Sequence, residues 1–152
     1  AICSLTYGAI LLKLGSEEDR YRIAGICALI AGGVSAVVAM ITGTGEEATW
    51  TLLLTLPAAV VAMAGEYNEY MGHSAVLSGV DNELSEKWEV LWKWYIGLFL
   101  GMFGCIFVML IIPILGALAI LGCAIGTVVV SILKLIYLYR TAKNFREYPV
   151  GV

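Results

Sequence analysis

The residues best suited to chemistry lie in one polar stretch, residues 66–94, which holds the chain's single histidine. If a helix runs through its start, Glu66, Tyr70 and His73 share one face, because residues three or four positions apart are neighbours on a helix. Glu69 precedes His73 by four positions, so those two side chains can also meet. Carboxylates and an imidazole gathered in this way could bind a divalent metal ion or pass protons. These four residues are the candidate ligand or proton site.

Matching ligands for a metal ion are missing from the rest of the sequence. Metal sites in helical bundles draw ligands from several helices, and the sequence has no second segment that combines a glutamate with a histidine. The four cysteines sit singly in apolar stretches, without the spacing of a zinc or redox motif. We therefore predict no metal, no cofactor and no catalytic residue. The alternative to a functional site is a solvated helical extension, which Gly72 could end beside an interfacial His73.

Aromatic residues close the polar stretch. Asp81 can cap the start of a helix, and the helix after it carries Trp88, Trp92, Trp94 and Tyr95. Tryptophan and tyrosine gather where a membrane meets water, because each combines an apolar ring with a polar group. We expect these four aromatic residues to anchor the chain at the membrane face. The alternative is a docking surface for a partner protein or a cationic ligand.

The composition places these residues in a membrane protein. Of the 152 residues, 61% are hydrophobic and only 14% are charged, whereas soluble proteins carry about 25% charged residues. This excludes a disordered chain and an ordinary soluble enzyme. The net charge of −3 does not indicate a nucleic-acid partner. We expect an all-α, polytopic helix bundle whose main partner is the lipid bilayer.

Five apolar stretches are candidates for transmembrane helices. One crossing requires about 20 residues, and the first stretch is short for that length. The stretches cover about 1–14, 23–42, 49–65, 94–112 and 116–138, with a cytoplasmic helical segment at 66–93 and a tail at 139–152. Pro113 and Gly116 mark the turn between the last two. All belong to a single predicted transmembrane domain, residues 1–152.

The basic residues orient these spans, because cytoplasmic loops are enriched in lysine and arginine. Eight of the nine basic residues fall on one side of the five-span arrangement, namely Lys13, Arg20, Arg22, Lys87, Lys93, Arg140, Lys143 and Arg146. Lys134 is the exception, and its long stem can carry the ammonium group to the membrane face. The pattern predicts an outside N-terminus and a cytoplasmic C-terminus in a bacterial-type cytoplasmic membrane. The acidic loop at 43–48 then lies outside.

Small residues repeat at four-residue steps in three of the predicted spans. They are Ala28 and Gly32, Gly97 and Gly101, and Gly122 and Gly126. Small side chains let helices approach closely in lipid, where association depends on packing. These pairs predict packing within the bundle, contact between copies of the chain, or both.

Ionisable residues are scarce inside the predicted spans, where no Asp, Glu, Arg or His lies. This argues against a proton-coupled antiporter that uses one buried carboxylate. We expect a transport, channel-like or accessory membrane subunit that associates with itself. One alternative is an interfacial membrane enzyme that acts on a lipid or amphiphile through Glu66, Glu69 and His73. Another is a structural or regulatory docking module.

Overall fold

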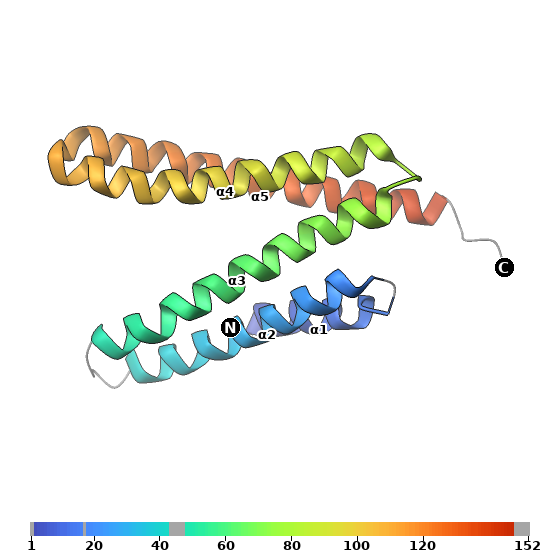
Figure 1. Ribbon diagram of the computed structural model, residues 1–152, viewed down its shortest axis with the longest axis horizontal. Helices are drawn as coiled ribbons and strands as arrows, with labels where there is room; N and C mark the ends of the chain where they lie inside the picture. The colour runs from blue at the N-terminus through green and yellow to red at the C-terminus, as the bar shows by residue number, and fades with distance from the viewer. Residues whose placement is uncertain (1, 17, 43–47, 148–152) are drawn as a thin grey trace. The chain divides into compact units, whose positions relative to one another are not determined.

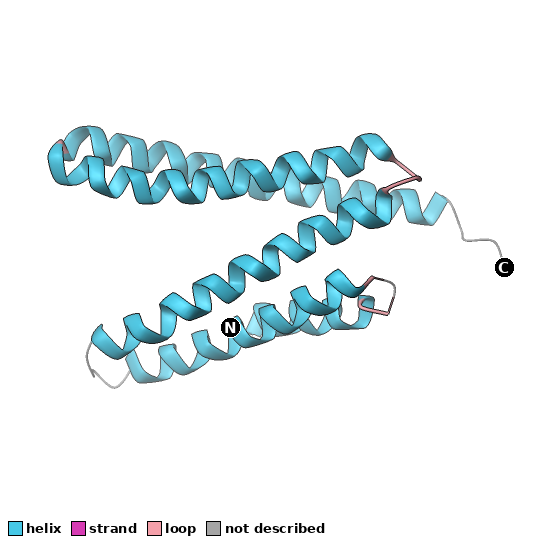
Figure 2. Ribbon diagram, in the orientation of Figure 1, coloured by secondary structure: helices cyan, strands magenta, loops and turns pink. Residues whose placement is uncertain are grey.

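The structure is a computed structural model that describes residues 2–16, 18–42 and 48–147. These residues form helices and contain no strand (Figures 1 and 2), which confirms the all-α fold class. The helices are α1 (Ile2–Leu14), α2 (Asp19–Thr42), α3 (Ala48–Leu77), α4 (Asn82–Ile111) and α5 (Pro113–Glu147). Residues 43–47, which make up most of the predicted acidic loop, and the tail residues 148–152 lie outside the described residues.

Three helices of the described chain are long and apolar enough to cross a membrane. They are found at Asp19–Ile41, Asn82–Ile111 and Pro113–Arg146. The first helix is apolar but shorter, over Cys3–Leu14. The protein is thus a helical membrane protein by the length and composition of its helices. The count of five spans and their orientation stay predictions.

The chain forms two compact units, Ala1–Gly72 and His73–Val152. The sequence predicts a single transmembrane domain over the whole chain, and that remains a prediction. The boundary falls inside α3, which continues without interruption through Pro57 and Gly72 to Leu77. Gly72 therefore does not end the helix as the sequence suggested it could. A Cβ atom at Gly72 would lie 3.1 Å from the Tyr21 ring, so this glycine serves close packing.

The first unit combines α1, α2 and most of α3. Its helices approach each other at glycines, where no side chain separates the backbones. A Cβ atom at Gly25 of α2 would lie 2.9 Å from the carbonyl oxygen of Gly8 in α1. A Cβ atom at Gly65 of α3 would lie 2.8 Å from the Cβ atom of Cys27 in α2. These contacts fix which faces of the three helices meet.

The second unit is built on the antiparallel pair α4 and α5, which run side by side (Figure 1). Ile112 separates them and has an extended backbone, φ −132° and ψ 89°. The next residue, Pro113, disfavours a helical conformation at Ile112 and is itself suited to the first turn of a helix. A Cβ atom at Gly116 would collide with the backbone of Met109, so only glycine fits at this close approach of the two helices. A turn between these two helices is therefore confirmed, but it lies at Ile112, and the predicted turn residues Pro113 and Gly116 belong to the first turn of α5.

A short connection joins α3 to α4. Gly79 has a positive φ of 91°, a conformation that glycine adopts without strain. Asp81 then caps α4, because its side chain accepts a hydrogen bond from the Leu84 amide at 3.0 Å. The helix start predicted at Asp81 is confirmed. A carboxylate at this position also interacts favourably with the helix dipole.

Candidate functional site

A cavity of about 130 Å³ lies among the three helices of the first unit. Its lining comprises Ser4, Tyr7 and Leu11 of α1, Ala24, Ala28 and Ala31 of α2, and Ala62, Gly65, Glu66 and Glu69 of α3. Two of the four predicted ligand or proton-site residues, Glu66 and Glu69, therefore face one cavity. Its other lining residues are mostly small, and they leave the space that the carboxyl groups border.

Glu69 is the more deeply buried of the two acidic residues. Its side chain is only 3% exposed, and it accepts a hydrogen bond of 2.6 Å from the hydroxyl of Tyr7. A carboxylate is costly to remove from water unless hydrogen bonds compensate for its lost hydration. The short distance is typical of a hydroxyl that donates to a charged acceptor. This bond links α1 to α3 at the edge of the cavity.

The helical repeat of α3 explains why both carboxyl groups reach the cavity. Ala62, Gly65, Glu66 and Glu69 are spaced by three, one and three positions, which places them along one face. Gly65 brings this face against α2. The acidic pair thus continues the stripe of small residues by which α3 packs.

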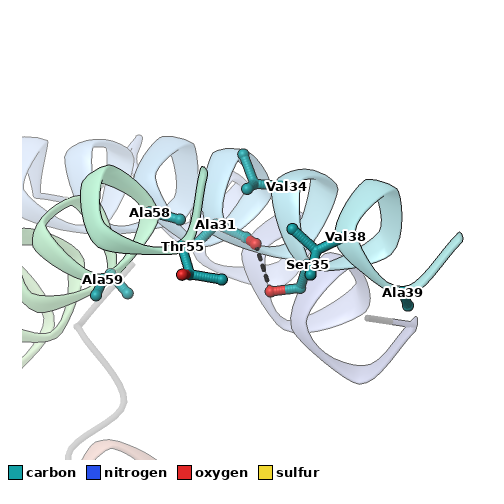
Figure 3. Close-up of a pocket in the computed structure, with 9 residues that line it drawn as sticks. Ala31, Val34, Ser35, Val38, Ala39, Thr55, Ala58 and Ala59 are labelled. Carbon is teal, nitrogen blue, oxygen red and sulfur yellow. Dashed lines mark hydrogen bonds between the residues drawn. The ribbon is translucent and has the colours of Figure 1, made fainter. Parts of the chain in front are cut away.

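A second, larger hollow adjoins the cavity on the side away from the acidic pair. It has a volume of about 360 Å³ and lies between α2 and α3 (Figure 3). Its lining comprises Ala31, Val34, Ser35, Val38, Ala39, Thr55, Ala58, Ala59 and Ala62. Ala31 and Ala62 line both spaces. We call the larger space the α2–α3 groove and the smaller one the acidic cavity.

The α2–α3 groove is apolar in character although two hydroxyl groups border it. Ser35 donates its hydroxyl to the carbonyl oxygen of Ala31 at 2.8 Å, as Figure 3 shows. Thr55 donates in the same way to the carbonyl oxygen of Thr51 at 2.8 Å. Both hydroxyl protons are therefore used within their own helices, a common arrangement for serine and threonine in apolar helices. What remains in the groove is alanine and valine surface.

His73 belongs to the second unit, where its ring stacks on Trp88 with 4.4 Å between ring centroids. The side chain is 6% exposed and Nε2 is shielded from solvent. Burial, with a smaller effect from the Lys134 charge, lowers the pKa of His73 to about 4. The imidazole is consequently neutral near pH 7. It is not among the residues that line the acidic cavity in the described chain.

Three buried hydroxyl residues, Ser74, Ser85 and Thr141, form hydrogen bonds in the second unit. The hydroxyl groups of Ser74 and Ser85 lie 2.9 Å apart, and Ser85 also donates to the carbonyl oxygen of Ser74 at 2.8 Å. Ser74 donates to Glu89 at 3.2 Å. The indole N–H of Trp88 donates to the Thr141 hydroxyl at 3.3 Å. Sequence reasoning singled out none of these hydroxyl residues, because their partners are distant in the chain or on another helix.

The remaining predicted residues occupy varied environments. Tyr70 is buried at 1% exposure. Among the aromatic set, Trp88 is fully buried, Trp92 stacks on Tyr95 at 5.8 Å, and Trp94 is 63% exposed. Trp94 thus has the exposure that an interfacial anchor needs, whereas Trp88 is a core residue.

The small residues predicted to serve packing also differ from one another. A Cβ atom at Gly32 would lie 3.1 Å from the Ser4 Cβ atom, and one at Gly126 would lie 2.7 Å from Leu98. A Cβ atom at Gly101 would make an ordinary contact of 3.7 Å with Cys123, and Ala28 lines the acidic cavity. At Gly97 and Gly122 an added Cβ would meet nothing within 4 Å.

The described residues contain no group of three or more His, Cys, Asp or Glu side chains that could hold a metal ion. The two carboxyl groups of the acidic cavity can instead attract a cation or accept hydrogen bonds from a polar solute. No known protein family, curated protein or solved structure matches the chain.

Proposed function

We propose that this protein is a transport subunit of a bacterial-type cytoplasmic membrane and that a small solute binds in the acidic cavity. The observation that carries the proposal is the cavity itself, which is bordered by Tyr7, Glu66 and Glu69. A transport protein has to hold its solute among its helices, and polar groups there mark solute pathways. Small-molecule sites commonly combine a mostly apolar lining with a few polar groups.

We further propose five spans with an outside N-terminus. The basic residues that flank the helices support this orientation, because eight of the nine fall on one predicted side. Glu66 and Glu69 then lie at the cytoplasmic end of the third span, directly beyond the apolar stretch 49–65. The acidic cavity would open near the cytoplasmic face.

Self-association is part of the proposal. Gly97 and Gly122 have open space where a side chain would begin, because among the described residues no neighbouring side chain or helix lies within 4 Å of that point. Small residues of this kind let a helix of a second copy approach closely in lipid. Chemical crosslinking in native membranes tests this point. A strictly monomeric protein would contradict it.

The two alternatives have less support. The interfacial enzyme needs Glu66, Glu69 and His73 together, yet His73 stacks on Trp88 and is not part of the cavity lining. The docking module needs an exposed aromatic surface, yet Trp88 is fully buried. We therefore favour transport over both.

Solute release from proteoliposomes tests the proposed function. Vesicles are loaded with radiolabelled tetramethylammonium, acetate and glycerol, which represent a cation, an anion and a neutral solute. We expect at least one of these solutes to leave protein-containing vesicles faster than it leaves protein-free vesicles. Equal release of all three from both preparations would contradict transport.

A further inference from the structure

We propose that the acidic cavity and the α2–α3 groove together bind one amphiphilic cation, an organic ammonium head carried on an elongated apolar tail. The head occupies the acidic cavity and the tail lies in the groove. This inference rests on the proposed function and deepens it, because it names the chemical class of the solute.

Charge complementarity selects a cation for the cavity. Glu66 and Glu69 are both part of its lining, and none of the described residues that line it is a lysine, arginine or histidine. An opposite charge within a few ångströms stabilises buried carboxylates. An anionic head would instead face two carboxyl groups among mostly small, apolar side chains, which is unfavourable for an anion.

Hydrogen bonding favours an ammonium head among cations. An ammonium group has donors only, and the cavity offers acceptors for them in the carboxyl oxygens. Tyr7 donates its proton to Glu69, which places the tyrosine hydroxyl beside one of these carboxyl groups. The volume of about 130 Å³ fits a compact head and excludes a large one.

The shape and chemistry of the groove select an elongated apolar tail. Ala31 and Ala62 line both spaces, so the groove adjoins the cavity. Glu66 and Thr55 are eleven positions apart on α3, a rise of about 16 Å along the helix. The groove volume of about 360 Å³ lies within the range of about 300–1,000 Å³ for small-molecule sites.

The groove is also open on one side. Ser35, Ala39, Thr55 and Ala59 are exposed in this chain, and in the five-span arrangement their surroundings are lipid. A tail can therefore enter from the bilayer without crossing a polar surface. The head then sits at the cytoplasmic end of the spans, which is the orientation of an amphiphile in that leaflet.

Equilibrium binding to the protein in lipid nanodiscs tests the inference. The probe is radiolabelled decylammonium, measured against empty nanodiscs of the same lipid. Decanoate has a similar chain with an anionic head, and methylammonium has the head without the tail. We expect saturable binding of decylammonium with an affinity at least about tenfold above that of either comparison compound. Saturable binding of decanoate as strong as that of decylammonium would overturn the inference.

Two variants locate the bound head. Glu66→Gln and Glu69→Gln should each weaken decylammonium binding at least about tenfold. Glu66→Gln keeps the Tyr7–Glu69 bond, so it answers the question even if Glu69→Gln fails to fold. Asp19→Asn is the control, because it removes the same charge from an exposed position of α2. Equal binding by Glu66→Gln and Asp19→Asn would overturn the inference.

Phenylalanine at Ala58 tests the tail. Ala58 lines the groove and does not line the acidic cavity, so Ala58→Phe should weaken decylammonium binding and leave a short ammonium probe unaffected. Unchanged decylammonium binding would place the tail elsewhere and overturn the inference.

The solute-release experiment distinguishes failure of this inference from failure of the proposed function. Decylammonium binding without release of any solute refutes transport and leaves the site standing, whereas release without such binding refutes the solute class alone.

Discussion

The hydrogen bond from Tyr7 to Glu69 offers a direct way to weigh the buried carboxylate. Tyr7→Phe removes one hydroxyl group and keeps the ring. The bond is 2.6 Å long and its acceptor is 3% exposed. Hydrogen bonds to charged groups contribute about 1.5–3 kcal/mol, whereas polar contacts between membrane helices average about 0.6 kcal/mol. Because this bond is short and its acceptor is a buried carboxylate, we expect a loss of about 1.5–3 kcal/mol in the free energy of unfolding.

A double-mutant cycle isolates the charge. In the Glu69→Gln background the acceptor is a neutral amide, and Tyr7→Phe should cost about 0.6 kcal/mol. The difference is a coupling energy of about 1–2 kcal/mol, well above the error of such cycles. Steric trapping in mild detergent measures the unfolding free energy of all four proteins. Equal losses in the two backgrounds would refute the view that Tyr7 stabilises a buried charge.

Three further predictions concern stability. The folded state holds the pKa of His73 at about 4 against 6.5 ordinarily. The unfolded chain therefore takes up the proton at a higher pH than the folded chain, and the free energy of unfolding should fall by up to about 3 kcal/mol as the pH drops from 6.5 to 4. Unfolding measured from pH 7 to 4 should show a shallower fall for His73→Gln than for the wild-type protein. Identical pH dependence of the two proteins would contradict this. Gly25→Ala should destabilise the protein by about 1–3 kcal/mol because the added Cβ atom meets the backbone of α1. Gly33→Ala in the same helix places its Cβ atom in open space and should be neutral or stabilise by up to about 1 kcal/mol. Thermal unfolding in detergent compares the two variants, and equal effects would argue against close packing at Gly25. In denaturant titrations, Trp88→Ala should lower the free energy of unfolding by about 3–5 kcal/mol and Thr141→Val by about 1–3 kcal/mol. A smaller loss for Trp88→Ala than for Thr141→Val would show that burial of the Trp88 ring is not its main contribution to stability.

Local features of the fold could be predicted from the sequence. Asp81 caps α4 through a bond within its own first turn, and Pro113 begins α5 directly after the break at Ile112. Both depend on neighbours within a few positions, so composition and spacing are sufficient. The membrane character follows in the same way from long apolar helices.

The site itself depended on which helix faces meet, and spacing alone does not determine that. The helical repeat made Glu69 and His73 neighbours on α3, yet Glu69 bonds to Tyr7 of α1 and His73 stacks on Trp88 of α4. Tyr7 gave no signal, because its partner lies 62 positions away. Gly8, whose carbonyl oxygen approaches Gly25, was missed for the same reason.

Solute release from vesicles that carry a cavity-filling variant tests the central claim most directly. Ala62 borders both the acidic cavity and the groove, so Ala62→Trp should block the solute that the wild-type protein releases fastest. Ala117→Trp introduces the same side chain at an exposed position of α5 and should release it at the wild-type rate. Transport through the acidic cavity predicts loss of release in Ala62→Trp alone. Wild-type release from Ala62→Trp vesicles would contradict it.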